Sequence, residues 1–169
     1  MKIVYDKAEL LSDLNQICLQ TLKEKPRMII SIAGPCGSGK STLGKFIRKK
    51  GFGNFKPYQI AVIDDNVMSL NLFIVRPKIR NTPPPHNSTK DNLKPFFKFL
   101  PPYIKIIFYI CANPTRIDFA DVVITIDIDE NRRYKQLKQR EKDPKLINSL
   151  MQSKLNINIP FTHWLCLKE

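Results

Sequence analysis

The sequence predicts an α/β domain in which a mostly parallel β-sheet carries helices on both faces, giving three layers. Short apolar runs rich in β-branched residues alternate along the chain with segments of helical periodicity. Strands that alternate with helices favour parallel pairing through right-handed crossovers, which brings helices to both faces of the sheet. The 169 residues suit one domain, so we expect residues 1–169 to form a single unit.

The first third of the chain is expected to form a helix, a strand and a second helix. The first helix begins after Asp6, a residue suited to capping, and ends before Pro26. Residues 28–33 form a short apolar run bounded by glycine and proline, which indicates a buried strand. Residues 41–50 favour a helix that Gly51 is placed to cap. A glycine-rich loop therefore joins this strand directly to this helix.

The later elements continue the alternation. Buried strands are expected at residues 58–63, 103–110 and 122–126, with a last short strand near Trp164. Helices are expected at 92–100 after Asp91, at 130–141, and at 144–155 after the capping pair Asp143-Pro144. Residues 76–90 contain three consecutive prolines and many polar residues, so we expect a loop there that is long enough to be functional or mobile. We expect this loop to help choose the acceptor.

The charge balance favours anionic partners. The chain has 28 Lys and Arg against 15 Asp and Glu, a net charge of +13, which suits nucleotides, polynucleotides or acidic surfaces. A compositional bias towards Lys, Asn and Ile would raise the charge in the same way without nucleic-acid binding. No stretch approaches the roughly 20 apolar residues of a membrane span, and the N-terminus lacks a signal-like apolar core. We therefore expect no membrane partner, a cytoplasmic protein, and free thiols at its four widely spaced cysteines.

The loop of residues 34–41, Gly-Pro-Cys-Gly-Ser-Gly-Lys-Ser, matches a pattern typical of phosphate binding. Glycines let the backbone turn so that its amides converge on phosphate oxygens, and the start of the following helix adds its positive end. In this pattern Lys40 bridges the terminal phosphates and Ser41 ligates Mg²⁺. The sequence thus predicts a P-loop NTPase fold with ATP and Mg²⁺ as cofactors. The residues expected to bind the nucleotide are Gly34, Pro35, Cys36, Gly37, Ser38, Gly39, Lys40, Ser41 and Thr42.

Residues 32–43 resemble the P-loop of the uridine kinase, phosphoribulokinase and pantothenate kinase group. The resemblance implies an ATP-dependent kinase that transfers the γ-phosphoryl group to a hydroxyl of a small molecule, either a nucleoside or another small metabolite. In that family a strand after the P-loop helix ends in an aspartate that faces the acceptor, and Asp64-Asp65 resembles this position. Residues 120–127 are similar to the strand that leads into the lid, and 130–141 would be the lid helix. Most of the chain is covered, but only the P-loop is a sharp motif.

Two carboxylates, Asp64 and Asp65, follow a predicted strand at the edge where open α/β sheets bind ligands. One of them can ligate Mg²⁺, directly or through water, while the other orients and deprotonates the attacking hydroxyl. The residue types leave open which aspartate has which role. An Asp-Asp-Asn turn without catalytic function is the alternative.

Basic residues crowd the predicted helix 130–141, which usually indicates an exposed surface. The resemblance instead implies lid arginines that close over ATP, and it selects Arg140 first and Arg133 second. The pattern departs from the family, because many members carry two arginines four apart where this chain has Gln136 and Arg140. Arg116 is expected to be either a phosphate contact or, more simply, a surface residue of a loop.

A second departure concerns the metal. The strand 103–110 is followed by Cys111 and has no acidic residue at the place where many P-loop proteins hold magnesium. Mg²⁺ would then rely on Ser41, Asp64 and Asp65, or catalysis would be weak or absent.

Two other functions are open. The first is a non-catalytic or switch-like nucleotide-binding protein; the later strands lack the Asn-Lys-x-Asp motif of a GTPase. The second is a polynucleotide 5′-hydroxyl kinase, which the charge of +13 motivates. The primary prediction remains a nucleoside triphosphate and a small acceptor as partners, with nucleic acid as a weaker alternative.

Overall fold

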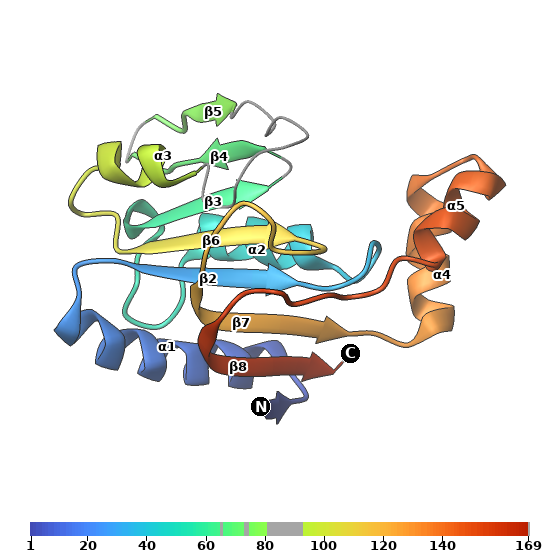
Figure 1. Ribbon diagram of the computed structural model, residues 1–169, viewed down its shortest axis with the longest axis horizontal. Coiled ribbons are helices and arrows are strands. Elements are labelled where there is room, and N and C mark those ends of the chain that lie inside the picture. Colours follow the sequence, from blue (N-terminus) through green and yellow to red (C-terminus); the bar gives the residue numbers. More distant parts are fainter. Residues whose placement is uncertain (65, 73–74, 81–92, 169) are drawn as a thin grey trace.

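The computed structural model describes residues 1–64, 66–72, 75–80 and 93–168, and these form an α/β fold around one β-sheet (Figure 1). The strands are β1 (Lys2–Val4), β2 (Met28–Ala33), β3 (Ile60–Asp64), β4 (Val67–Ser69), β5 (Lys78–Arg80), β6 (Ile106–Cys111), β7 (Ala120–Asp127) and β8 (Phe161–Lys168). The helices are α1 (Lys7–Glu24), α2 (Lys40–Lys50), α3 (Lys94–Phe99), α4 (Glu130–Arg140) and α5 (Pro144–Met151), with a 3₁₀ turn at Pro57–Gln59.

The sheet has the order β1-β8-β7-β2-β6-β3-β4-β5 and is mostly parallel, as predicted. Pairing is parallel from β1 through to β3, and antiparallel between β3 and β4 and between β4 and β5. From β2 the chain passes to β3 on one side, whereas from β6 it passes to β7 on the other side of β2. The carboxyl end of β2 is therefore the point where the order reverses, and ligands of open α/β sheets bind at such points.

Two apolar clusters fill the space on the two faces of the sheet. On one face α1 and α2 pack against the sheet with buried side chains such as Leu14 and Ile47. On the other face the cover consists of α3 and of connecting segments that carry Ile104, Ile117 and Ile159. The predicted three layers are present, although extended segments make up much of the second cover.

The first elements agree closely with the sequence analysis. The side chain of Asp6 accepts a hydrogen bond of 2.8 Å from the amide of Glu9, which caps α1 as expected. The strand β2 has the predicted bounds, and α2 begins one residue earlier than predicted. The amide of Gly51 donates to the carbonyl of Ile47 and ends α2. These elements follow local signals, and so the sequence is sufficient to place them.

Elements that depend on distant partners differ more from the predictions. The strand β8 runs for eight residues because it pairs with both β1 and β7. The three-residue strands β1, β4 and β5 were not predicted, and α5 ends at Met151 instead of continuing to residue 155. The predicted loop 76–90 contains β5, and its residues 81–90 lie outside the described ranges, as does the predicted cap Asp91.

The helices α4 and α5 stand beyond the carboxyl ends of the strands, on the same side as the loop between β2 and α2 (Figure 1). Asp129 caps α4 by accepting a hydrogen bond of 3.0 Å from the amide of Arg132, and Asp143 caps α5 as predicted. In the described part of the chain, no helix combines the length and the apolar character that a membrane span needs.

Candidate nucleotide-binding site

The glycine-rich loop connects β2 to α2 at the centre of the carboxyl edge of the sheet. Its backbone takes left-handed conformations at Gly37 (φ 83°) and at Gly39 (φ 87°), which is the N-cap of α2. A Cβ at position 37 would lie 2.8 Å from Cγ of Leu137 on α4. Glycine at position 37 is therefore required both by the backbone and by the close approach of α4.

The loop and the start of α2 present hydrogen-bond donors that suit an anion. No side chain caps α2, and the amides of Gly37, Gly39, Lys40 and Ser41 donate to no acceptor within the described residues. The hydroxyl of Ser38 is buried and also has no partner in the described part of the molecule. Buried polar groups normally have partners, and the first amides of a helix favour negative charge. This donor set fits the phosphates of a nucleotide, as the sequence predicted.

Lys40 lies over the loop that precedes it. Its Nζ donates to the carbonyl oxygens of Gly34, at 2.7 Å, and Pro35, at 2.8 Å. Burial lowers the pKa of Lys40 below its ordinary value of 10.5, and Arg133 lowers it further, whereas Cys36, Cys111 and Asp64 act in the opposite direction. The ammonium group therefore lies within electrostatic reach of the carboxyl ends of β3 and β6.

Asp64 is the last residue of β3 and is half-buried at the carboxyl edge, where the sequence placed it. Asp65 lies outside the described residues. Asn66 follows with φ 63°, and Asp64 pairs with Val67 on the antiparallel strand β4. The left-handed conformation of Asn66 is typical of a turn, and it coexists with the edge position of Asp64, so it is no argument against a functional carboxylate there.

The end of β6 carries no acidic residue, in keeping with the sequence analysis. Cys111 occupies this end, with its Sγ 3.8 Å from the hydroxyl of Ser31, and burial raises the pKa of the Cys111 thiol to about 12. The thiol is therefore neutral at physiological pH. Within the described ranges no group of three His, Cys, Asp or Glu side chains is arranged to hold a metal ion. Mg²⁺ is commonly held by one or two side chains together with phosphate oxygens and water, so Ser41 and Asp64 fit this use.

Arg133, one of the two predicted lid arginines, lies beside the loop but is buried in a network of its own. Its Nε donates to the carbonyl of Cys36 at 2.8 Å, and its Nη2 donates to the carbonyl of Leu150 at 2.6 Å and to Oγ of Ser153 at 2.9 Å. The same Oγ accepts a hydrogen bond of 3.2 Å from the amide of Cys36. Arg133 and Ser153 therefore fasten the end of α5 to the phosphate loop.

The contribution of Ser153 was not predicted, because residue 153 falls inside the helix expected at 144–155, which in fact ends at Met151. A serine following a helix carries no signal of its distant partner. Its role becomes visible only when α4, α5 and the loop are placed together.

Arg140, the other predicted lid arginine, lies at the end of α4 with a side chain that is 62% exposed. Its Nε pairs with Oε1 of Glu141 at 2.9 Å, and no recorded contact within the described ranges connects it with the phosphate loop. The structure thus brings Arg133 to the loop and leaves Arg140 at the surface.

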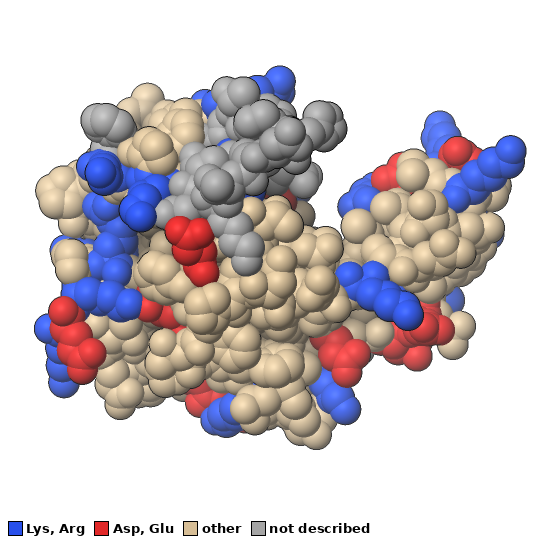
Figure 2. Space-filling model, viewed as in Figure 1, with Lys and Arg blue, Asp and Glu red and all other residues tan. Residues whose placement is uncertain are grey.

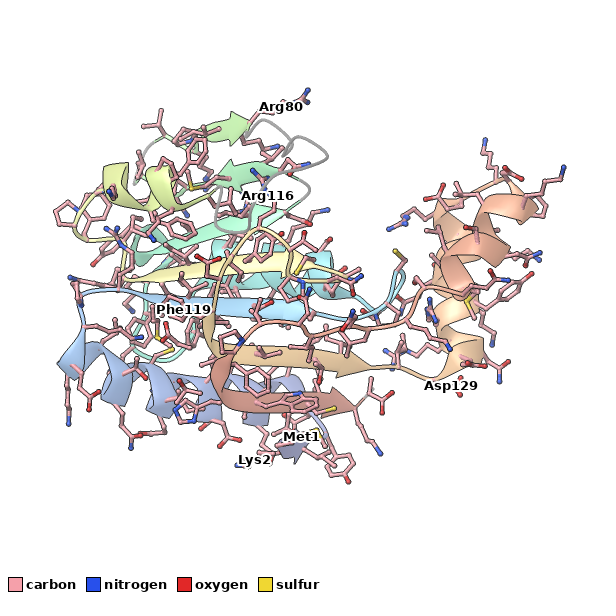
Figure 3. The ribbon with its side chains drawn as sticks, in the orientation of Figure 1. Met1, Lys2, Arg80, Arg116, Phe119 and Asp129 are labelled. Carbon is pink, nitrogen blue, oxygen red and sulfur yellow. The ribbon has the colours of Figure 1, made fainter. Side chains whose placement is uncertain are left out.

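Arg116 corrects one expectation, since it is not a surface residue. It is only 5% exposed, and it comes from the segment between β6 and β7 (Figure 3). Its Nη1 donates to Oδ1 of Asn66 in the turn that follows β3. The Arg116 side chain therefore binds the side chain of Asn66, two residues after Asp64. The sequence did not predict this burial because it depends on a partner fifty residues away.

A cavity of about 490 Å³ opens beside Asp64, on the face of the sheet that α2 covers. The residues that line it are Lys45, Arg48, Val62, Asp64, Val67, Ser69, Lys78, Arg80 and Ile110. Lys78 and Arg80 belong to the segment 76–90, whose part in choosing the acceptor stays a prediction. The cavity size lies in the range of small-molecule sites.

Comparison with known proteins supports the identification of the fold. A family model described as an AAA domain matches residues 30–155, which extend from β2 through α5 to the segment after it. This family is P-loop NTPase-like and includes kinases. No curated protein matches the chain. The narrower resemblance to the uridine kinase group stays a prediction.

Proposed function

Because the chain belongs to this AAA domain family, we propose that it is an ATP-dependent kinase that transfers the γ-phosphoryl group to a hydroxyl of a small molecule. The observation that supports this most directly is the position of Asp64. It lies at the carboxyl end of β3, within electrostatic reach of Lys40, and it also lines a cavity beside α2. A phosphate donor and an acceptor would thus meet at one carboxylate.

The nucleotide half of the proposed site uses the loop and the first turn of α2. The amides of Gly37, Gly39, Lys40 and Ser41 would bind phosphate oxygens, and the Lys40 ammonium would exchange the carbonyls of its own loop for the terminal phosphates. Mg²⁺ would neutralise charge on the phosphates, with the hydroxyl of Ser41 as a ligand and Asp64 or Asp65 as a second ligand, direct or through water.

The acceptor half would supply the base. The acceptor hydroxyl oxygen forms a bond to the γ-phosphorus while the bond between that phosphorus and the oxygen that bridges to the β-phosphate breaks. The bonding electron pair of the breaking bond leaves with ADP, and the hydroxyl proton goes to the carboxylate of Asp64 or of Asp65. Arg116 has a positioning role here, because it holds the turn next to Asp64.

The two predicted lid arginines receive different roles in this proposal. Arg133 positions the phosphate loop through the carbonyl of Cys36, so it acts on the nucleotide indirectly. Arg140 is the candidate to neutralise charge in the transition state, and this requires α4 and α5 to move towards the loop. Figure 2 shows a notch between the α4–α5 projection and the body of the molecule, into which such a movement can take place.

The test of this function is the transfer of labelled phosphate from ATP to pooled small acceptors and to a 5′-hydroxyl oligonucleotide in parallel. Labelling of a small acceptor is the expected result. Labelling of neither substrate, together with ATP binding, would favour a non-catalytic nucleotide-binding protein, the second candidate. The neutral Cys111 at the end of β6 is the observation that favours that candidate.

The polynucleotide 5′-hydroxyl kinase requires a basic surface that follows a nucleic-acid backbone. Among the described residues on the face seen in Figure 2, lysines and arginines form separate groups with uncharged and acidic surface between them. We therefore expect weak, non-specific oligonucleotide binding at physiological salt, with a Kd of about 0.1 mM to 1 µM. Labelling of the oligonucleotide alone, with affinity that falls steeply as salt rises, would reverse this ranking.

A further inference from the structure

The floor of the cavity beside Asp64 consists of two rows of side chains that cross the sheet. Strand register places Ile110, Asp64, Val67 and Arg80 in one row, at the carboxyl edge. The neighbouring row contains Val62, Ser69 and Lys78. Because side chains two apart on a strand share a face, both rows lie on the face that α2 covers. The register therefore brings two cations of β5 to the same surface as Asp64.

The helix α2 forms the wall of this cavity. Ser41, Lys45 and Arg48 follow one another at spacings of four and three, so they lie on successive turns of one side of the helix. Lys45 is thus about 6 Å along the helix axis from the predicted Mg²⁺ ligand. A Cβ at Gly44 would lie 2.1 Å from Cδ1 of Ile110, so α2 packs directly on the sheet at this point. The cavity consequently begins where the nucleotide half of the site ends.

The lining of the cavity is strongly positive. Among the described residues, the lining has four cations, Lys45, Arg48, Lys78 and Arg80, against the single carboxylate of Asp64. None of the four cations forms an ion pair with a residue in the described ranges. Arg48 is half-buried, while the other three are exposed at the rim, and Figure 3 shows Arg80 extending outwards from the end of β5. Like charges that share a concave surface repel one another, and a bound anion relieves this repulsion.

We propose that this cavity binds an acceptor that already carries a phosphate group, and that its four cations hold that phosphate while the reacting oxygen faces Asp64. The proposal rests on the kinase function and names its class of substrate. With a neutral nucleoside, the four cations would have only the carboxylate of Asp64 as a counter-charge among the described lining residues. A phosphate monoester supplies two negative charges and three oxygens, which suit arginine and lysine donors from two sides.

A small monoester fits these observations better than a polynucleotide. The cavity of about 490 Å³ is of the size that holds one small molecule. Its cations come from only two elements, α2 and β5, and all four line this one cavity. The phosphate-binding role is therefore local, and a polynucleotide acceptor is an outcome that the experiment can reveal.

The test uses the full chain with a non-hydrolysable ATP analogue and Mg²⁺ at saturation, so that the phosphate loop is filled. Nucleoside 5′-monophosphates, nucleoside 3′-monophosphates and ribose 5-phosphate are then titrated, each beside its dephosphorylated counterpart, and a 5′-hydroxyl oligonucleotide is titrated in parallel. The variant is Lys78→Gln with Arg80→Gln, on an exposed edge strand. The matched control is Lys23→Gln with Lys49→Gln, which removes two exposed charges that do not line the cavity.

We expect at least one phosphorylated probe to bind more tightly than its dephosphorylated counterpart, and the Lys78, Arg80 variant to lose about tenfold or more of this affinity. The control variant should keep it, and both variants should bind the ATP analogue and melt like the original protein. The inference would be overturned if every phosphorylated probe bound as tightly as its dephosphorylated counterpart. It would also be overturned if variant and control lost the same affinity for the phosphorylated probe, or if only a 5′-hydroxyl oligonucleotide bound. ATP binding and phosphate transfer are measured separately, so a failure of the kinase function is distinguishable from a failure of the cavity.

Discussion

The guanidinium of Arg133 on α4 donates from its Nε to the carbonyl oxygen of Cys36, which lies in the middle of the phosphate loop, at 2.8 Å. The same side chain reaches the carbonyl of Leu150 and the hydroxyl of Ser153. One buried arginine thus joins the nucleotide loop to both helices of the projection. If α4 and α5 move relative to the sheet, either these hydrogen bonds break or the phosphate loop moves together with the two helices.

Replacing Arg133 by Ala should loosen the projection and weaken nucleotide binding together. The change leaves buried carbonyl groups without donors, so we expect the free energy of unfolding to fall by about 1–3 kcal/mol. Denaturant unfolding measures this loss, and hydrogen exchange in residues 130–151 locates it. Lys135→Ala, an exposed change on the same helix, is the control. Equal protection from hydrogen exchange in residues 130–151 of both variants would show that Arg133 does not fasten α4 and α5.

Replacing Lys40 by Ala should remove catalysis and weaken triphosphate binding. The phosphate loop offers its ammonium as the cation next to the open amides of α2. Calorimetric titration of ATP with Mg²⁺, together with a turnover assay, provides the measurement. If binding and turnover both matched those of the original protein, the nucleotide site would have to lie elsewhere.

ATP affinity should fall at alkaline pH, starting below the ordinary lysine pKa of 10.5. Burial lowers the pKa of Lys40, so its ammonium loses a proton at lower pH than a free lysine does. A bound phosphate favours the charged form and raises that pKa again, and hence ATP binding takes up protons as pH approaches the lowered pKa. Titration in buffers of different ionisation enthalpy measures this uptake. In Lys40→Arg the guanidinium keeps its charge, so the uptake attributed to Lys40 should disappear.

Asp64→Asn and Asp65→Asn separate the two carboxylates. Loss of the general base should lower phosphoryl transfer by about a hundredfold or more, while ATP affinity changes little. Loss of a metal ligand should instead change the Mg²⁺ concentration needed for half-maximal rate. Both variants are compared at saturating ATP with an acceptor that has been identified. If each single variant kept the turnover of the unchanged protein, Asp64 and Asp65 would form only a turn and have no catalytic role.

The central part of the fold could be predicted because its signals are local. The β-branched run of β2, the glycines of the loop and the caps at Asp6, Gly51 and Asp143 each act within a few residues. Local chemistry also placed Asp64 at the carboxyl edge of the sheet. The nucleotide half of the candidate site was therefore accessible from the sequence.

The acceptor half depends on contacts between distant segments. The strand β5 is only three residues long and all three are exposed, so its place in the sheet depends on pairing with β4. Arg116 looked like a surface residue because nothing near it in sequence shows that Asn66 accepts its hydrogen bond. Arg133 was assigned to the nucleotide by resemblance, whereas its recorded partners are carbonyl and hydroxyl groups of the protein. These properties arise from tertiary packing alone.

The edge position of β5 has a consequence for how this protein can evolve. All three residues of the strand are exposed, so substitutions there change the charge beside Asp64 with little loss of apolar packing. The phosphate loop has no such freedom, because Gly37 is fixed by its backbone conformation and by Leu137. Selection could therefore exchange Lys78 and Arg80 for other side chains while the nucleotide half stays constant. In this fold, substitutions on the edge strand β5 can change which acceptor binds, at a small cost in stability.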